Sequence, residues 1–302
     1  MNCESDKQKN PVFQQDLTQK EPPGYTFIMT LFMREMCAMP DKAHMTSILQ
    51  NHLGSGECFA YSENAAGFAP ESYKVEFKQG TIPPQLMITG CTERNAGLID
   101  AMTVSQMWDC QEDRERILEE CQYQVLAADM LAASMDYKQR ADMLMNFLEA
   151  LIELYPTCEA VYFTNSGKMF TADRIRNHTI PKDRRFLYFA VNVRFFNIEG
   201  SADKVIDTLG MSTLFLPDLQ YHFHGMEPDW IVNHAYNMLS YIFDSKNPIE
   251  NDDHIDGVNS QSGRMDADVQ WKCHYENALI QPAREVIDIC MNEHAAGGRN
   301  YE

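Results

Sequence analysis

The sequence contains no C-x-x-C pair, no long apolar run and comparatively few basic side chains. Its nine cysteines are an odd number and are scattered, which disfavours a zinc ribbon or a thioredoxin-like site and is typical of buried free thiols. No apolar stretch approaches the roughly 18 residues of a membrane-spanning helix, and the segment up to Lys20 is too polar for a signal peptide. We therefore expect a protein of the reducing cytoplasm.

Lysine and arginine together number 25, against 44 aspartates and glutamates, so the formal net charge is −19. Such a charge repels nucleic acid and anionic membrane surfaces, and we expect neither as a partner. It suits a basic protein partner or mimicry of DNA, or simply the solubility of an acidic cytosolic protein. With 44% hydrophobic and 23% charged residues, the 302-residue chain has the composition of a globular protein that buries a core.

Several catalytic sequence motifs are also missing: G-x-S-x-G, G-x-x-x-x-G-K, G-x-G-x-x-G and H-E-x-x-H. Hydrolase, P-loop, dinucleotide-binding and zinc-protease functions therefore have no direct support. The acidic loop around Asp256 and Gly257 lacks the regular spacing and the closing glutamate of a calcium loop. We interpret it as a solvated loop.

Strand and helix patterns alternate without a regular βαβ order, which favours an α+β fold over a doubly wound one. We expect a two-layer α/β sandwich over residues 25–290, with two related lobes, 25–110 and 158–290, that share central helices in 112–155. Residues 1–24 and 291–302 are too polar or too close to the ends to pack, and we expect a disordered and a frayed tail.

The individual elements follow from hydrophobic periodicity and from capping residues. Helices are expected at 41–53, 113–133, 137–155 and 228–243, and residues 246–268 are expected to form a long acidic loop. Strands are expected at 25–33, 57–61, 73–78, 85–91, 160–164 and 186–198, and in a closing hairpin of 269–275 and 284–289.

The stretch from Asp207 to Gly225 is the one around which the other elements are arranged. Thr208-Leu-Gly-Met-Ser-Thr-Leu-Phe-Leu-Pro-Asp-Leu predicts a bend, and the alternation that follows predicts a strand with one buried face. The segment resembles the T-L-G-L-x-x-F-G-L-P-E-L pattern of the bacterial family called domain of unknown function 4261. It departs from the pattern at the second glycine and has Asp218 where the pattern has glutamate. The order of the other elements is also similar, from Tyr25 to about Ile289. The family name implies no activity.

Three histidines are candidate metal ligands. His222 and His224 lie two apart on the expected strand, so both rings point to one face, and His234 follows on the next helix. Neutral imidazoles that converge there could bind a divalent metal such as zinc or iron. The alternative is a polar strand face together with a core histidine near Trp230 and Met238. Apart from such a metal, no cofactor is expected.

Basic residues gather in one segment of this acidic chain: Arg174, Arg176, Lys182, Arg184 and Arg185. Such a cluster could bind a phosphate or an acidic partner. The alternative is that these side chains only solvate a loop.

Two functional hypotheses remain from the sequence. The first is a non-enzymatic, protein-binding or accessory module, for example an immunity-type protein that neutralises a basic toxin. The second is a metal-dependent enzyme that uses His222, His224 and His234. Convergence of the three rings favours the enzyme, whereas an exposed apolar patch with carboxylates at its rim favours the binding module.

Overall fold

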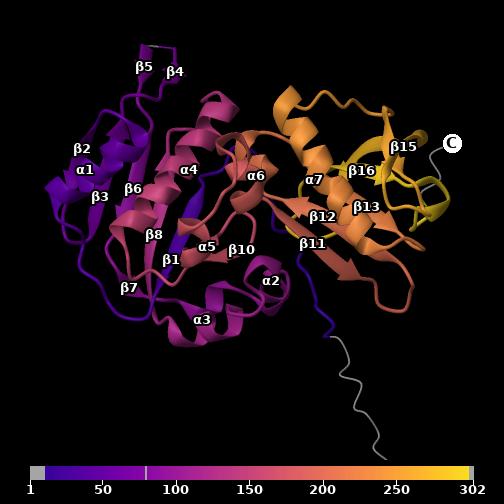
Figure 1. The fold of residues 1–302 in the computed structure, drawn as a ribbon, viewed down its shortest axis with the longest axis horizontal. Helices are drawn as coiled ribbons and strands as arrows, with labels where there is room; N and C mark the ends of the chain where they lie inside the picture. The colour runs from indigo at the N-terminus through magenta and orange to yellow at the C-terminus, as the bar shows by residue number, and fades with distance from the viewer. Residues whose placement is uncertain (1–10, 79, 299–302) are drawn as a thin grey trace, which may run out of the picture.

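The structure of the protein is a computed structural model that describes residues 11–78 and 80–298. Its first sheet has eight strands and only antiparallel pairs. The strands are β1 (Ile28–Met33), β2 (Gly56–Tyr61), β3 (Ala65–Pro70), β6 (Gln85–Thr89), β7 (Thr92–Glu93), β8 (Tyr123–Met130), β9 (Ala160–Phe163) and β10 (Lys168–Thr171). Their order is β10-β9-β1-β8-β6-β3-β2, and β7 pairs with β8. A separate hairpin of β4 (Val75–Phe77) and β5 (Gly80–Ile82) projects from this part of the molecule (Figure 1).

The second sheet has six strands in the order β11-β12-β13-β16-β15-β14. They are β11 (Asn192–Asn197), β12 (Lys204–Leu209), β13 (Asp218–Phe223), β14 (His254–Val258), β15 (Met265–Asn277) and β16 (Glu285–Cys290). The pair of β13 and β16 is parallel and the other pairs are antiparallel. The last strand in sequence therefore lies in the middle of the sheet.

The α-helices are α1 (Lys42–Leu53), α2 (Ala101–Ser105), α3 (Arg114–Glu120), α4 (Tyr137–Leu154), α5 (Ala172–Arg176), α6 (Arg185–Ala190) and α7 (Pro228–Ser245). Short 3₁₀ turns are η1 (Ala96–Leu98), η2 (Trp108–Cys110), η3 (Lys182–Arg184), η4 (Met211–Leu214) and η5 (Asn292–His294). The expected α+β class is confirmed. None of the helices in the described ranges has the length and apolar character needed to cross a bilayer.

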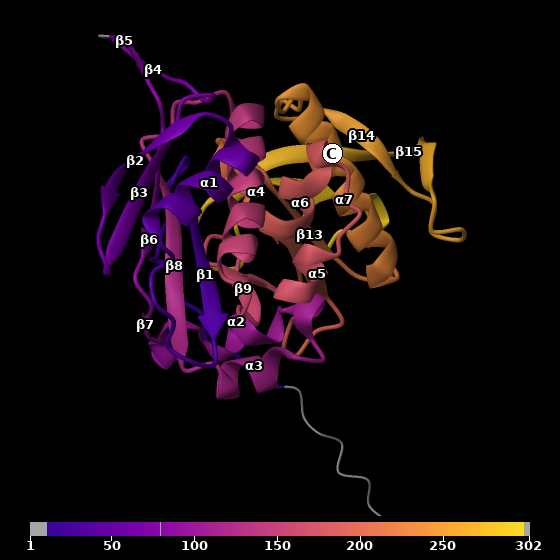
Figure 2. The same ribbon diagram turned by 60° about the vertical axis from the view of Figure 1, so that its left-hand side comes forward.

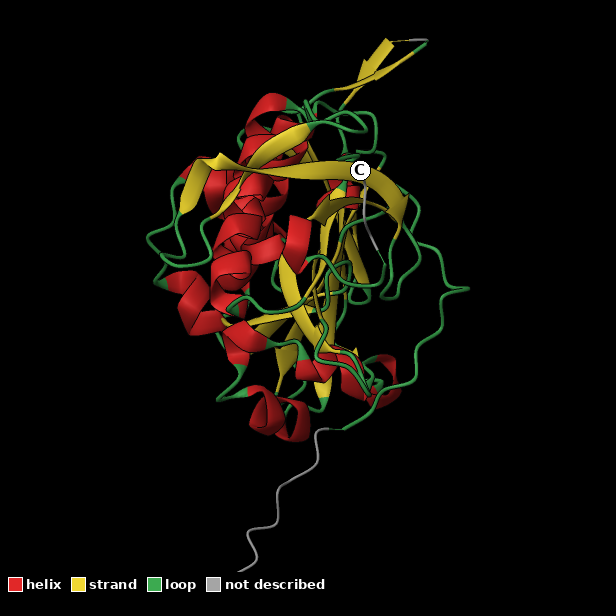
Figure 3. Ribbon diagram, turned by 90° about the vertical axis from the view of Figure 1, so that its right-hand side faces the viewer, coloured by secondary structure: helices red, strands yellow, loops and turns green. Residues whose placement is uncertain are grey.

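Helices occupy the space between the two sheets. From one side to the other, Figure 2 shows the first sheet, α4, α6 and α7. Helix α7 packs on strands of the second sheet, and α4 contacts α1, α5, α6 and η4. Seen from the second sheet, most helices lie on one side of the strands and loops cover the other (Figure 3). The second sheet therefore has one helix-covered face and one loop-covered face.

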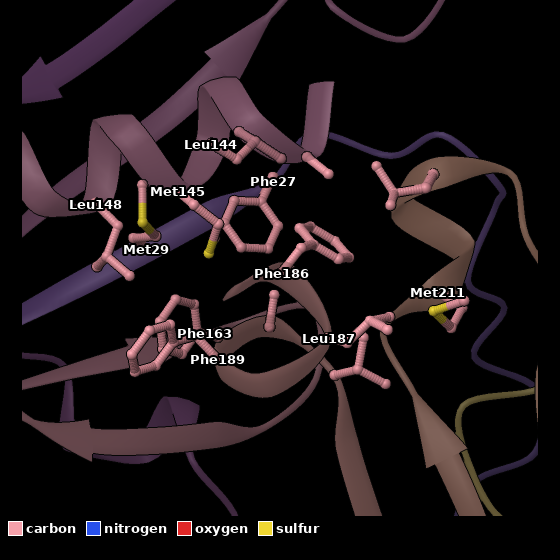
Figure 4. Close-up of a cluster of buried hydrophobic side chains, with 14 of the residues drawn as sticks. Phe27, Met29, Leu144, Met145, Leu148, Phe163, Phe186, Leu187, Phe189 and Met211 are labelled. Atoms are coloured by element: carbon pink, nitrogen blue, oxygen red, sulfur yellow. The ribbon is translucent and has the colours of Figure 1, made fainter. Parts of the chain in front are cut away.

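One hydrophobic core joins the two sheets. The rings of Phe27 and Phe186 lie 5.9 Å apart between centroids, next to Leu144 of α4, with Met211 toward the second sheet (Figure 4). Buried Arg140 of α4 adds polar links, because its guanidinium pairs with Asp129 at 2.8 Å and donates to the carbonyl of Thr213 in η4. Packing and hydrogen bonds thus hold the second sheet against α4.

An aspartate side chain caps the N-terminus of two helices, α1 and α4. The Asp41 carboxylate accepts from the backbone N–H of Ala43 at 2.9 Å, and that of Asp136 accepts from Gln139 at 3.1 Å. Each satisfies a backbone donor that a helix start leaves unpaired. Helices α1 and α4 accordingly match the expected 41–53 and 137–155.

The helix expected over 113–133 is wrong beyond its first turns. Helix α3 ends at Glu120, and Tyr123–Met130 forms β8, which pairs with β1 and β6. Alanine, leucine and glutamine in this segment favour helix weakly, and pairing on both sides overrides that preference.

Two other segments also differ from the expectation. The strand expected at 186–198 begins only at Asn192, because Arg185–Ala190 forms α6 and buries Phe186 and Phe189 against α4 and β10. The loop expected at 246–268 contains β14 and the start of β15. Gly257 leaves room for the ring of Trp271, since a Cβ there would lie 2.6 Å from that ring.

The observed sheets divide the chain at other positions than the expected lobes 25–110 and 158–290. Strand β8 within 112–155, together with β9 and β10 after it, completes the first sheet, so the change from one sheet to the other falls between Thr171 and Asn192. Which sheet a strand belongs to depends on the strands with which it pairs. Those partners lie far away in the sequence, and composition does not identify them.

The ends of the chain are held by hydrogen bonds where they are described. Of the expected tail 1–24, residues 1–10 lie outside the described residues, whereas residues 11–24 run beside the loop before β16. There the carbonyl of Gln19 accepts from Ala283 N–H at 2.8 Å, and Glu21 N–H donates to the Ala283 carbonyl at 3.1 Å. We call residues 11–24 the strap. At the other end Ala296 N–H donates to the His222 carbonyl, and residues 299–302 are outside the described part.

Candidate functional site

His234 is part of the core beneath α7. Its Nε2 lies 2.8 Å from the Asp256 carbonyl, which can only accept, so Nδ1 accepts from the Tyr221 hydroxyl at 2.9 Å. Burial lowers the pKa of His234, because it disfavours the charged ring. Both ring nitrogens are thus engaged within the protein.

His222 lies on the other face of β13, and His224 follows directly after the end of that strand. Side chains alternate along a strand, and Tyr221 points to α7, so His222 points away from it. His222 Nε2 is 3.8 Å from an Asp203 carboxylate oxygen. Within residues 11–78 and 80–298, no three histidine, cysteine or carboxylate side chains are grouped as metal ligands. The structure therefore does not bring His222, His224 and His234 together.

A row of polar side chains crosses the loop-covered face of the second sheet. The strand register pairs one residue of each strand with one of the next, from β11 through β12, β13 and β16 to β15. Residues that are paired in this way point to the same face of the sheet. Gln220 marks this face, because it alternates with Tyr221, and its amide donates to Asp288 at 3.0 Å. We call the set the polar row: Arg194, Asp207, Gln220, Asp288 and His274.

The segment from Thr208 to Leu219, which carries the family-like pattern and is called the signature from here on, forms the bend beside this row. Gly210 has φ of +131°, and a Cβ there would lie 2.5 Å from the Ala190 carbonyl oxygen, so the position requires glycine. The Asp218 carboxylate accepts from the Thr208 hydroxyl at 2.9 Å and from the Met211 N–H at 3.3 Å. The carboxylate of the signature thus closes the bend that its threonine and glycine begin.

Two arginines neutralise the aspartates at this end of the row. Asp207 accepts from Arg194 at 2.8 and 2.5 Å and from Arg284 at 2.8 Å. Nε of Arg284 lies 3.4 Å from Asp218. All four side chains are almost fully buried, so each charge depends on its partners for stabilisation.

Glu21 of the strap adds a third carboxyl to these charges. Burial of the Glu21 carboxyl is the largest effect on its pKa and, together with the negative charge of Asp218, raises it to about 7. The positive charges of Arg284 and Arg194 act in the opposite direction. Two guanidiniums already face two aspartates, so an ionised Glu21 would give the group an excess negative charge. We call Glu21, Arg194, Asp207, Asp218 and Arg284 the charge cluster.

A cavity of about 410 Å³ opens beside the charge cluster, between the two sheets. We call it the junction cavity. Its size is within the range of small-molecule sites, which often lie where two structural units meet. The walls come from the strap, the loop before α2, the turn after β9, the start of β11 and the loop before β16. Its polar lining includes Lys20, Glu21, Asp100, Gln106, Thr164, Asn165, Ser166, Asn192, Arg194 and Gln281.

An apolar groove of about 730 Å³ runs beside β11, the terminal strand of its sheet. We call it the β11 groove. Its lining is mostly apolar, with Glu199 at one end: Pro11, Val12, Phe13, Met102, Trp108, Phe195, Phe196, Ile198 and Ile280. Gln106 bridges its middle, because its side-chain oxygen accepts from Phe195 N–H at 2.9 Å and from the Trp108 ring at 3.2 Å.

The basic residues that the sequence singled out are mostly ion-paired. Arg184 forms two bonds of 2.7 Å with Asp244, and buried Arg185 pairs with Glu149 at 2.5 Å. Arg176 pairs with Asp173 at 2.8 Å, and Arg174 lies 3.6 Å from Asp109 and also donates to that residue's carbonyl. Lys182 is exposed at the start of η3. These residues do not form one free basic surface.

Sequence reasoning missed the polar row and the charge cluster. A signal was present, since Arg194 and Asp288 each interrupt an apolar strand run, Val-Arg-Phe-Phe and Val-Ile-Asp-Ile. A lone ionisable residue inside such a run needs a buried partner. The partner itself depends on strand register over long sequence separations.

A protein-family model matches part of the chain. Residues 207–290 match the family described as Domain of unknown function (DUF4261). This is a smaller part of the chain than the resemblance over residues 25–289 suggested, and Glu21 and Arg194 lie outside it. The searches of curated proteins and of solved structures found no significant match. The segment from Asp207 to Cys290, with its signature bend and most of the polar row, is thus the part of the chain that is similar to the domain of unknown function DUF4261.

Proposed function

We propose that the protein is a cytoplasmic, non-enzymatic binding module that holds an extended segment of a partner protein in the β11 groove. The observation that carries this proposal is an apolar groove beside a strand that pairs on one side only. Extended peptides add to such edges through backbone hydrogen bonds, and neighbouring apolar side chains select the sequence.

The backbone of β11 supplies suitable groups. The Phe195 N–H donates to the Gln106 side chain rather than to β12, so it points away from the sheet. The backbone N–H of Asn197, two residues later, points the same way, because N–H groups alternate in direction along a strand. The Gln106 amide occupies the place of a neighbouring strand and would be displaced by one. Trp108, with 44% of its surface exposed, is the aromatic residue best placed to contact the added segment.

Charge suggests the chemistry of the partner. The net charge of −19 and Glu199 in the groove favour a segment that alternates apolar and basic side chains. An immunity-type protein that neutralises a basic toxin is one form of this proposal. The eight described cysteines are free thiols, which supports a reducing compartment.

Fluorescence polarisation with a labelled octapeptide of alternating lysine and valine tests the proposal. We expect binding to the whole protein, weakened about tenfold by Trp108→Ala because it removes an aromatic interface contact. Tyr241→Ala, which changes an equally exposed aromatic residue on α7, is the control. We expect Asn197→Pro to weaken binding as well, because it removes an outward donor without removing a bond to β12. Equal binding by all variants would refute the groove as the site.

A further inference from the structure

The junction cavity is separate from the β11 groove in its chemistry. Its lining is richer in polar groups and includes two members of the charge cluster, Glu21 and Arg194. Ser166 lines it with a fully buried side chain whose hydroxyl has no hydrogen-bond partner among the described residues. Buried polar groups without partners are uncommon in proteins, and a bound molecule is one explanation for such a group.

The charged groups around Glu21 indicate which kind of ligand suits the junction cavity. Asp218 of β13 and Asp207 of β12 are negative, and Arg194 of β11 and Arg284 before β16 are positive, while η4 contributes the Ser212 hydroxyl. One basic and one acidic residue, Lys20 and Asp100, also line the cavity. Within the charge cluster, whose members are all described residues, Glu21 is therefore the carboxyl that forms no ion pair with either arginine.

We infer that the junction cavity binds a small organic cation, an amine or guanidine compound, which enters as Glu21 gives up its proton. The ammonium group pairs with the Glu21 carboxylate, and the Ser166 hydroxyl and neighbouring carbonyl oxygens accept its remaining hydrogens. Tyr25 and Tyr162 also line the cavity, and aromatic rings attract cations. The released proton goes to the buffer, so that charge balances.

Proton exchange makes binding depend on pH. Only the ionised carboxyl accepts the cation, so the apparent affinity follows the ionised fraction of Glu21. With a titration midpoint near 7 that fraction rises from about one tenth at pH 6 to about nine tenths at pH 8. We expect the affinity to rise about tenfold over this range.

Isothermal titration calorimetry with 1,4-diaminobutane tests the inference, and succinate, a molecule of the same length and opposite charge, is the matched control. We expect diaminobutane to bind more tightly at pH 8 than at pH 6, and to release protons at pH 7 in buffers of different ionisation enthalpy. Glu21→Gln should abolish both effects. Glu57→Gln, which removes one exposed carboxylate on β2, should preserve them.

Three outcomes would overturn the inference. They are an affinity independent of pH in the unchanged protein, equal binding by Glu21→Gln, and tighter binding of succinate than of diaminobutane. Proton release is measured on the unchanged protein, so the test remains decisive even where the Gln variant folds poorly. Peptide binding in the β11 groove is measured separately, and either proposal can fail alone.

Discussion

Arg194 and Asp207 face each other across β11 and β12 and form two hydrogen bonds, of 2.8 and 2.5 Å, in a site closed to solvent. The same carboxylate accepts from Arg284 at 2.8 Å, so one aspartate holds two guanidiniums. Arg284 also reaches the Thr208 carbonyl at 2.7 Å and thereby connects the start of β16 to the signature bend. A single acidic residue thus links β11, β12 and the residue directly before β16.

Replacing Asp207 by alanine should lower the free energy of unfolding by about 3–5 kcal/mol, because it leaves two buried guanidiniums with too few partners. Asp244→Ala is the control, since it removes a carboxylate that also pairs with an arginine but is half exposed. We expect about 0–1 kcal/mol there. Urea denaturation measures both, and similar losses would contradict the role given to burial.

Glu21 should make the stability depend on pH. Its pKa rises from 4.5 to about 7 on folding, so the unfolded chain ionises first as the pH increases. Stability is therefore lost between about pH 4.5 and pH 7, and the loss approaches roughly 3 kcal/mol at higher pH. Glu21→Gln does not ionise, and we expect it to be more stable than the unchanged protein at pH 8 but not at pH 4. Urea midpoints at the two pH values measure this, and an equal difference at both would show that Glu21 does not titrate as described.

Tyr221→Phe should cost about 1–3 kcal/mol, since it leaves Nδ1 of His234 buried without a donor. Tyr241→Phe removes the hydroxyl of an exposed tyrosine on α7 and should change the stability little. Thermal unfolding followed by circular dichroism compares the two variants. A Tyr221→Phe protein as stable as the unchanged one would mean that another group satisfies the imidazole.

Gly210→Ala should destabilise the protein more than Gly80→Ala. Both glycines have similar positive φ angles, +131° and +136°, so the backbone strain is similar. Only at Gly210 would the new Cβ meet a backbone oxygen, whereas nothing lies within 4 Å of it at Gly80. Chemical denaturation of the two variants measures how much unfolding free energy the steric contact at Gly210 costs. Equal losses of unfolding free energy in both would argue against close packing of the bend on Ala190.

Local signals determined how much of the fold could be predicted. Helices with an aspartate cap and a sustained apolar face, such as α4, were placed to within one residue at their ends. Strand β8 was missed, because its residues favour helix weakly and its identity as a strand depends on β1 and β6, which lie elsewhere in the sequence.

The candidate site was harder to predict for the same reason. The signature pointed to Asp218 and Gly210, which lie close together in the chain, but not to Arg284 or Glu21 as their partners. His222 and His234 are near in sequence, but His234 lies on the α7 side of the second sheet and His222 points to its other face. Side chains on opposite faces of a strand point away from each other, even where their spacing in the sequence is short.

The central place of β16 constrains the order in which the protein can fold during synthesis. Until Glu285–Cys290 leaves the ribosome, β13 and the β14–β15 hairpin have no strand to join them, and the Asp218 carboxylate lacks its arginine. A nascent chain that has already made β11, β12, β13 and α7 thus carries an open strand edge, which is a site for mispairing. The strap cannot bind the second sheet much earlier, because its partner Ala283 lies just before β16. Completion of the second sheet therefore waits for the synthesis of β16, which joins β13 to β15.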